Sequence, residues 1–228
     1  DFFGYTNIAR GISKWMGIEL MENFRMPYFS ASPSAFWGRW HISLSTWLRD
    51  YLYIPLGGNR AGEWMTLRNL MLTMLLGGLW HGARWNFVAW GAFHGLLLIG
   101  YRLATPTWER WRPTSRFAGV GLHLIGVAVF FGFTMFGWLL FRVKGLGDVG
   151  VLFGRMCDWK WNGGIVLYSL ALYAGPVVLI DAWQEWKRDS LAVRCLPAAL
   201  RYLLYLGMFY AIVYGGARAE NAFIYFQF

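Results

Sequence analysis

Among the residues that could do chemistry, His81 has the most unusual surroundings, because it stands in an uncharged Gly-Gly-Leu-Trp-His-Gly-Ala run at residues 77–83. Burial lowers the pKa of a histidine and keeps it neutral near pH 7, the state in which a general base takes a proton from a hydroxyl. The alternative is a histidine that hydrogen-bonds a neighbouring helix. Residue types and spacing alone leave the two interpretations even.

Arg84 follows His81 by three positions and is the single formal charge in residues 69–101. It could bind an anionic group beside the histidine. One straight helix over this region would overshoot a bilayer, so we expect two spans or a broken helix, with breaks at Gly77–Gly78 and Gly82. Irregular backbone at membrane depth is tolerated where protein buries it or water lines it, which suggests a cavity here.

His41 is followed one turn later by Ser45, so a nucleophilic Ser–His pair is conceivable. The interpretation that residue spacing favours is the polar face of an interfacial helix. Arg49 and Asp50, further along the same segment, could pair with each other across the site or contact lipid headgroups.

His94 lies 13 positions after His81, about 220° around an unbroken helix, so the two would not share a face. With no carboxylate or cysteine nearby, this spacing does not favour a metal or haem site. We expect His94 to bond a neighbouring helix and His123 to pack within an apolar span. Two isolated cysteines, Cys157 and Cys195, supply neither a zinc site nor a disulfide framework, and no metal is expected.

The composition indicates a membrane protein. The chain is 57% hydrophobic, 20% aromatic and only 14% charged, whereas soluble domains are about 25% charged. Its net charge of +9 comes from Lys and Arg scattered through short loops. This distribution favours anionic lipid headgroups as the partner and not nucleic acid. We therefore predict an all-α, polytopic transmembrane helical bundle.

Three segments are the plainest spans: residues 117–141, 161–180 and 198–217. The first contains no Asp, Glu, Lys or Arg and would reach about 37 Å as a helix, enough for a hydrocarbon core of about 30 Å. The third spans if Arg201 snorkels to the interface. All the loops are basic, so the positive-inside rule selects no orientation.

The pattern of residue types over residues 32–53 predicts an amphipathic helix that is interfacial or re-entrant. Ser32 is suited to cap it and Pro33 to occupy its first turn. Pro55 and residues 57–59 would end it. One apolar stripe is expected from Trp37, Trp40, Leu44, Trp47, Leu48 and Tyr51.

Residues 34–60 closely resemble the membrane-bound O-acyltransferase family, in its bacterial alginate O-acetyltransferase branch. They include Arg-Trp-His-Ile-Ser (39–43) and Ile-Pro-Leu-Gly-Gly-Asn-Arg (54–60). The Leu-Trp-His-Gly-Ala run (79–83) extends the match. The resemblance also covers residues 1–5, 68–70, 75–78, 90–91, 94–95 and 223–228.

This resemblance implies a ring of tilted helices around a pinched funnel, with His81 at the narrow point and His41 as the second polar site residue. Residues 33–103 would form the motif-bearing core. The chain opens without Met, and we expect residues 1–228 to be the C-terminal portion of a single, longer membrane domain.

The implied reaction moves an acetyl group from a cytoplasmic thioester, acetyl-CoA, toward a polysaccharide by way of an extracytoplasmic acetyltransferase. The protein would be a multi-pass component of the bacterial inner membrane and would need no bound cofactor. His81 would act as base, and His41 would orient the acceptor or polarise the acyl carbonyl. Substrate contacts are also expected from Arg84, Arg49, Asp50, Ser45 and Asn69.

Three alternatives stay open. A D-alanyl-transferring relative that works on teichoic acids shares the two histidine motifs, although residues 54–60 and the Phe-Gln-Phe ending favour polysaccharide acetylation. From other classes, the chain could be a channel subunit with His81 and Arg84 lining a pore, or an inactive scaffold that recruits a periplasmic transferase. Arg84 stands where the family often has a small or polar residue, which could alter donor preference.

Overall fold

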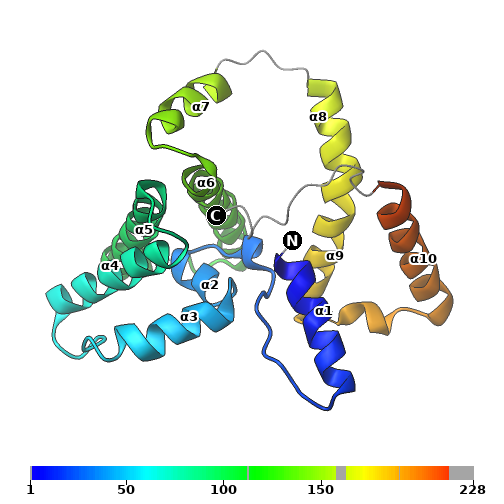
Figure 1. Ribbon diagram of the computed structural model, residues 1–228, viewed down its shortest axis with the longest axis horizontal. Coiled ribbons are helices and arrows are strands. Elements are labelled where there is room, and N and C mark those ends of the chain that lie inside the picture. The colour runs from blue at the N-terminus through cyan, green and yellow to red at the C-terminus, as the bar shows by residue number, and fades with distance from the viewer. Residues whose placement is uncertain (1, 112, 158–162, 190, 216–228) are drawn as a thin grey trace. The chain divides into compact units, whose positions relative to one another are not determined.

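The computed structural model describes residues 2–111, 113–157, 163–189 and 191–215, and within these ranges all the regular structure is helical. The prediction of an all-α chain is confirmed for this part. The chain divides into two compact units, residues 2–160 and residues 161–228, which are described separately. Figure 1 labels their helices.

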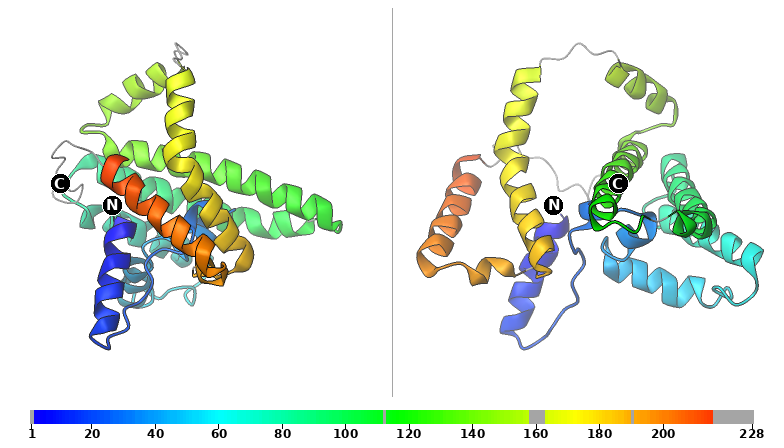
Figure 2. Two further views of the ribbon diagram at one scale, coloured as in Figure 1. Left: turned by 90° about the vertical axis from the view of Figure 1, so that its right-hand side faces the viewer. Right: turned by 180° about the vertical axis from the view of Figure 1, so that it is seen from behind.

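In the first unit, the short elements come first: α1 (Phe2–Trp15), η1 (Pro27–Phe29), α2 (Pro33–Trp37), α3 (Ile42–Leu48) and the π-helical η2 (Arg49–Tyr53). Longer helices follow: α4 (Glu63–Trp80), α5 (Trp85–Arg110), α6 (Arg116–Arg142) and α7 (Gly147–Cys157). Helix α5 packs between α4 and α6, and the three form the body of the unit (Figure 2).

Helices α4 and α5 cross with their backbones in contact. A Cβ on Gly78 would lie 2.2 Å from the carbonyl oxygen of Phe87, and one on Gly91 would lie 2.4 Å from that of Met74. Glycines at helix crossings allow such close approach. Our expectation that Gly77–Gly78 breaks the helix is therefore wrong: α4 continues through both glycines to Trp80.

The predicted break near Gly82 is confirmed. Residues 81–84 form a turn between α4 and α5. Gly82 has φ +151°, a backbone conformation that residues other than glycine rarely adopt. Residues 69–101 thus form two helices, as expected for a segment too long to cross a bilayer once.

The single amphipathic helix expected over residues 32–53 is interrupted. Ser32 does cap α2, its hydroxyl accepting a hydrogen bond from the Ala35 amide, with Pro33 in the first turn. The helix ends at Trp37, and His41 then takes a left-handed conformation with φ 42° and ψ 55°, which separates α2 from the next helix. A new helix, α3, starts at Ile42. Sequence periodicity did not reveal this break, because apolar residues continue at helical spacing across it.

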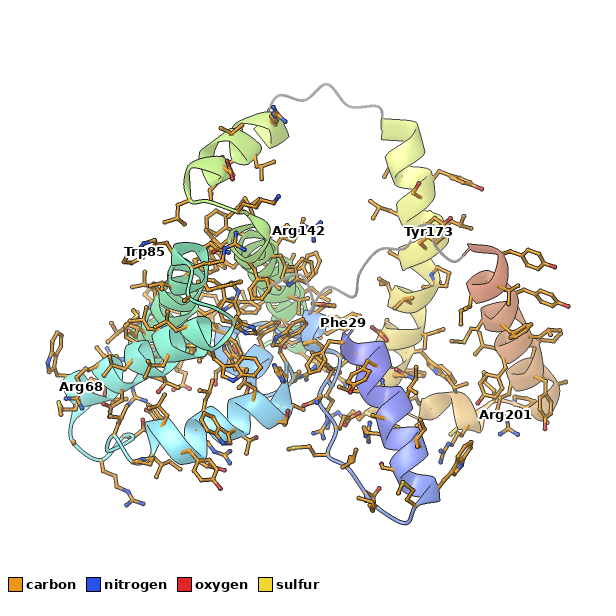
Figure 3. The ribbon with its side chains drawn as sticks, in the orientation of Figure 1. Phe29, Arg68, Trp85, Arg142, Tyr173 and Arg201 are labelled. Atoms are coloured by element: carbon orange, nitrogen blue, oxygen red, sulfur yellow. The ribbon has the colours of Figure 1, made fainter. Side chains whose placement is uncertain are left out.

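Two helices, α5 and α6, are long and apolar enough to cross a membrane. The predicted span over residues 117–141 falls within α6. Many apolar side chains of α6 are exposed, among them Phe117, Leu124 and Ile125, each more than 60% accessible. Exposed apolar surface on an apolar helix of this length suits contact with lipid. Figure 3 labels Trp85 and Arg142, the first residue of α5 and the last of α6.

In the second unit, α8 (Gly163–Ser169), the π-helical η3 (Leu170–Ala174) and α9 (Gly175–Lys187) follow one another directly. The short η4 (Ala192–Cys195) and the apolar α10 (Ala198–Gly215) complete it. That residues 161–180 and 198–217 cross the membrane stays a prediction. Residues 161, 162, 216 and 217 at the ends of these segments lie outside the described part of the chain. The motif at residues 223–228 lies outside it as well.

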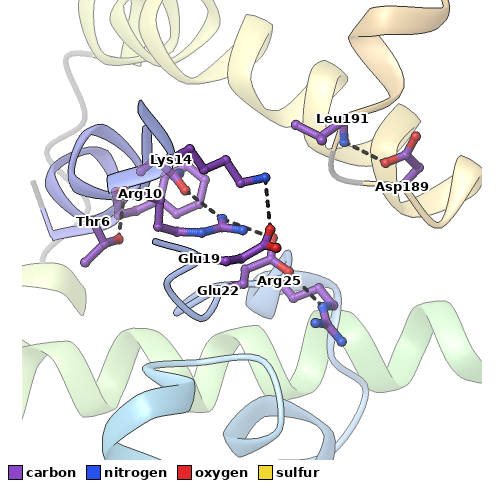
Figure 4. Close-up of polar contacts among 10 residues, drawn as sticks. Thr6, Arg10, Lys14, Glu19, Glu22, Arg25, Asp189 and Leu191 are labelled. Atoms are coloured by element: carbon purple, nitrogen blue, oxygen red, sulfur yellow. Dashed lines mark hydrogen bonds and ion pairs between the residues drawn. The ribbon is translucent and has the colours of Figure 1, made fainter. Parts of the chain in front are cut away.

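Ion pairs tie α1 to the segment that follows it. Lys14 lies 3.0 Å from Glu19, and Arg10 lies 3.9 Å from Glu22 (Figure 4). The chain therefore reverses after α1 and brings Phe24 back to Phe2, with 5.3 Å between ring centroids. Both rings also contact His41, so the N-terminal residues help to position this histidine.

Candidate functional site

Trp80 lies between His41 and His81 and joins the two predicted site histidines into one cluster. Its ring centroid is 6.1 Å from that of His41 and 5.0 Å from that of His81. The two imidazoles come from turns at the start of α3 and the end of α4. Residues 40 positions apart in sequence therefore meet around one indole.

The backbone directly after His41 is held by Asn23. Asn23 fixes the start of α3: its carbonyl accepts from the Ile42 amide at 2.9 Å, and its side-chain oxygen accepts from the Ser43 amide at 3.0 Å. These bonds satisfy amides that have no partner within the helix. The imidazole is 8% exposed, with the Phe2 ring 4.7 Å away.

His81 stands against aromatic rings at the end of α4. Phe141 approaches edge-on at 4.9 Å and Trp90 at 5.3 Å, with Phe87 at 6.1 Å. The residue is half-buried. In the described part of the chain, neither the His81 nor the His41 imidazole makes a side-chain hydrogen bond, so ring packing orients both and leaves their nitrogens available.

Both imidazoles lie outside α5 and α6, the two candidate spans. Burial lowers the pKa of His81 below its usual 6.5. Burial also lowers the pKa of His41, and a positive charge on His81 would lower it further. Two neighbouring cations in a desolvated site repel each other. The pair is therefore neutral at physiological pH and holds at most one proton readily.

The other polar residues of this segment are engaged elsewhere. The Ser45 hydroxyl donates to the Trp40 carbonyl at 3.0 Å, and the described structure contains no bond between it and the His41 imidazole. Arg49 donates two hydrogen bonds to the Asp50 carboxylate, at 2.7 and 3.2 Å, and the pair is exposed. These bonds hold the pKa of the Asp50 carboxyl below its usual value.

Arg84 and Asn69 lie in different settings. Arg84 is exposed at the start of α5 and donates to the Lys144 carbonyl at 3.0 Å. Asn69 is fully buried, and its amide donates to the carbonyls of Leu56 and Gly58, each at 3.1 Å. Its oxygen accepts two bonds from Arg68. Asn69 therefore holds the turn before α4 in place.

The remaining histidines differ from their expected roles. His94 is 3% exposed, but its Nδ1 has no hydrogen-bond partner among the described residues, so the expected bond to a neighbouring helix is not formed there. It packs among aromatic rings instead. His123 was expected to pack within its span, but it is exposed on α6.

Within the described residues, no three His, Cys, Asp or Glu side chains gather into a group that could hold a metal ion. Cys195 is an exposed free thiol, and the side chain of Cys157 lies outside the described part.

A cavity of about 930 Å³ lies between α5 and α6, and neither His41 nor His81 lines it. Its walls are mostly apolar and include Leu97, Tyr101 and Val129, with His123 and Arg116 among the polar groups. The glycines at 77 and 78, which suggested a cavity beside His81, are used instead for helix contact. The predicted site residues do not line this cavity.

Sequence reasoning missed several residues that shape the site. Asn23 lies in an irregular segment with no motif, so only the folded chain shows that it fixes the start of α3. Trp80 and Trp90 fall inside recognised motifs, and their position there was the available signal. Phe141 reaches His81 from the end of α6, a contact that depends on how the helices pack.

In the described residues the regular structure is helical, two helices are long and apolar enough to cross a membrane, and two helix-end histidines meet around a tryptophan. The family model of the membrane-bound O-acyltransferases matches residues 1–141, more than half of the chain, and the chain belongs to this family.

Known relatives carry three related activities in their names. A probable alginate O-acetylase of Pseudomonas syringae is 45% identical over 83% of this chain and 38% of its own length. A peptidoglycan O-acetyltransferase of Helicobacter pylori is 42% identical over 77% of this chain and 35% of its own. A teichoic acid D-alanyltransferase of Bacillus subtilis is 34% identical over 63% of this chain and 38% of its own length. The chain thus spans less than two fifths of the length of these relatives.

Proposed function

We propose that the whole protein is an O-acyltransferase that moves an acetyl group from acetyl-CoA toward an extracytoplasmic polysaccharide. The observation that carries this proposal is the pair of neutral imidazoles around Trp80, with no hydrogen bond to either ring in the described part of the chain. Acyl transfer to a hydroxyl needs a base for the proton and a donor for the oxyanion. Two neutral imidazoles can supply one of each.

In the proposed reaction, His81 takes the proton of the acceptor hydroxyl as its oxygen attacks the thioester carbonyl. His41 donates a hydrogen bond to the carbonyl oxygen, which becomes the oxyanion of the tetrahedral intermediate. The intermediate collapses, the carbon–sulfur bond breaks, and the thiolate leaves with the proton that His81 had taken. The lowered pKa of both histidines supports this assignment, because a base must begin unprotonated.

The surroundings of the pair suit a membrane site. We place α5 and α6 across the inner membrane of a bacterium as part of a polytopic bundle, with α2, α3 and η2 as the interfacial or re-entrant segment. Exposed Arg84 lies three residues from His81 and can attract the phosphates of the donor. An extracytoplasmic acetyltransferase would accept the acetyl group and pass it to the polymer.

Labelled acetyl-CoA supplied to membranes that contain the full-length protein tests this proposal. Label should reach the extracytoplasmic acceptor in the parent protein, and His81→Ala should reduce the transfer rate by about 10²- to 10⁴-fold. His123→Ala, which replaces an exposed histidine on α6, is the matched control and should transfer at the parent rate.

The outcomes separate the alternatives. Transfer from a D-alanyl carrier, with none from acetyl-CoA, would assign the chain to the reaction named for the Bacillus subtilis relative. Full acetylation in His81→Ala would reject the catalytic assignment and leave a channel or a scaffold. The amount of each variant protein in the membrane fraction shows whether that variant is inserted.

A further inference from the structure

Beside the histidine pair lie two buried polar atoms of complementary type. Nδ1 of His94 and the indole Nε1 of Trp37 are both buried, and neither has a hydrogen-bond partner among the described residues. Their rings are adjacent, with centroids 5.3 Å apart at 80°. An indole nitrogen can only donate, whereas one nitrogen of a neutral imidazole accepts.

Trp90 connects these two rings to His81. Its ring centroid lies 4.7 Å from that of His94, one helical turn away on α5, and 5.8 Å from that of Trp37 on α2. Trp90 also meets His81 edge-on, with 5.3 Å between ring centroids and 85° between the ring planes. Trp37 and His94 therefore pack against Trp90, the ring that contacts His81.

Phe36 and Gly137 lie next to the His94 imidazole. Phe36 stacks on this imidazole at 10° with 6.2 Å between centroids. On α6, a Cβ at Gly137 would lie 3.0 Å from Nε2, so that nitrogen already faces the helix backbone. Nδ1 is the buried His94 nitrogen without a partner among the described residues, and the Trp37 ring is next to the same imidazole.

Leaving a buried donor or a buried acceptor without a hydrogen bond destabilises the folded protein. A single water can satisfy both, because it accepts from one group and donates to the other, and buried waters commonly make two to four such bonds. Among the described residues, no polar group forms a hydrogen bond with either atom.

We propose that Trp37 and His94 bind one water molecule between the indole N–H and Nδ1, and that this bridge makes His94 a positioning residue for His81 through Trp90. The positioning role rests on the proposed function, whereas the water site does not. With the bridge in place, α2 and α5 are locked together at Trp90, and the His81 ring keeps one orientation toward the acceptor hydroxyl.

Two variants test the bridge by removing one nitrogen while keeping a ring. In the full-length protein, His94→Phe and Trp37→Phe should each lower kcat by roughly 10-fold, since small misplacements of a catalytic group are costly. The double variant should be no slower than the slower single variant, because either change removes the same bridge. His94→Asn, which keeps a polar atom near the Nδ1 position, should recover part of the rate. His123→Phe is the matched control and should not change it.

Solid-state nitrogen NMR on the protein labelled at histidine supplies a readout that packing alone does not move. The Nδ1 signal of His94, identified by its loss in His94→Phe, should receive polarisation from water protons and should shift in Trp37→Phe. No transfer from water to this nitrogen would overturn the water site. Parent-level kcat in His94→Phe would overturn the positioning role. An active His81→Ala variant would reject the proposed function instead, and the NMR result would still decide the water site.

Discussion

At the start of α4, buried Thr66 and Asn69 have hydrogen-bond partners close at hand, whereas at its end His81 faces aromatic rings with its imidazole nitrogens unbonded in the described structure. Thr66 donates to the Gly62 carbonyl, and Asn69 bonds two carbonyls and Arg68. The first arrangement is complete and therefore structural. The second leaves donor and acceptor capacity unused, and such capacity in a desolvated setting is what proton transfer requires.

The largest expected effect concerns the end of α4. His41→Ala should reduce the rate of acetyl transfer by about 10²-fold, because one hydrogen-bond donor to the oxyanion is lost. In the double variant His41→Ala, His81→Ala, the rate should fall by less than the product of the two single reductions, because both histidines act on one step. Initial rates of label transfer measure this. Independent, multiplicative losses would show that the two histidines serve different steps.

The close crossing of α4 and α5 is the next test. Gly78→Ala places a Cβ on the Phe87 carbonyl, so the two backbones must separate, at a cost of about 3 kcal/mol or more. The matched control is Gly121→Ala on α6, where no atom lies within 4 Å of the added Cβ. Thermal unfolding in detergent, followed by tryptophan fluorescence, should show a large drop for the first variant and little change for the second.

The start of α4 should respond in stability and not in chemistry. Asn69→Ala leaves the Leu56 and Gly58 carbonyls without their donor, and about 1–3 kcal/mol should be lost. Asn7→Ala, at an exposed position on α1, should have no measurable effect on unfolding. If Asn69→Ala instead abolished transfer at unchanged stability, the contrast between the two ends of α4 would not hold.

The smallest effect is expected from pH. Because burial lowers the pKa of His41 and His81, both stay neutral as pH falls from 8 to 6.5, and the transfer rate should change little. Their contribution to stability is fully present above the usual pKa of 6.5 and is lost as pH falls below it, since the unfolded chain then binds protons that the folded site resists. A rate already halved at pH 6.5 would indicate a solvated base.

The sequence predicted the helical class, the apolar span within α6 and the Ser32–Pro33 helix start, because these depend on local composition and spacing. It also placed a break at Gly82. The break at His41 was missed, since the bonds from Asn23 that stabilise it come from a segment 20 positions away. Periodicity carries no information about such a partner.

The two histidines were singled out by residue type and by resemblance, but their meeting around Trp80 is a result of packing. The same is true of the glycines, which suggested space around His81 and in fact bring α4 against α5. A glycine permits either a break or a close approach, and only the neighbouring helix determines which occurs. Sequence thus determined which groups could react, and tertiary structure decided which nitrogens stay buried, neutral and unbonded.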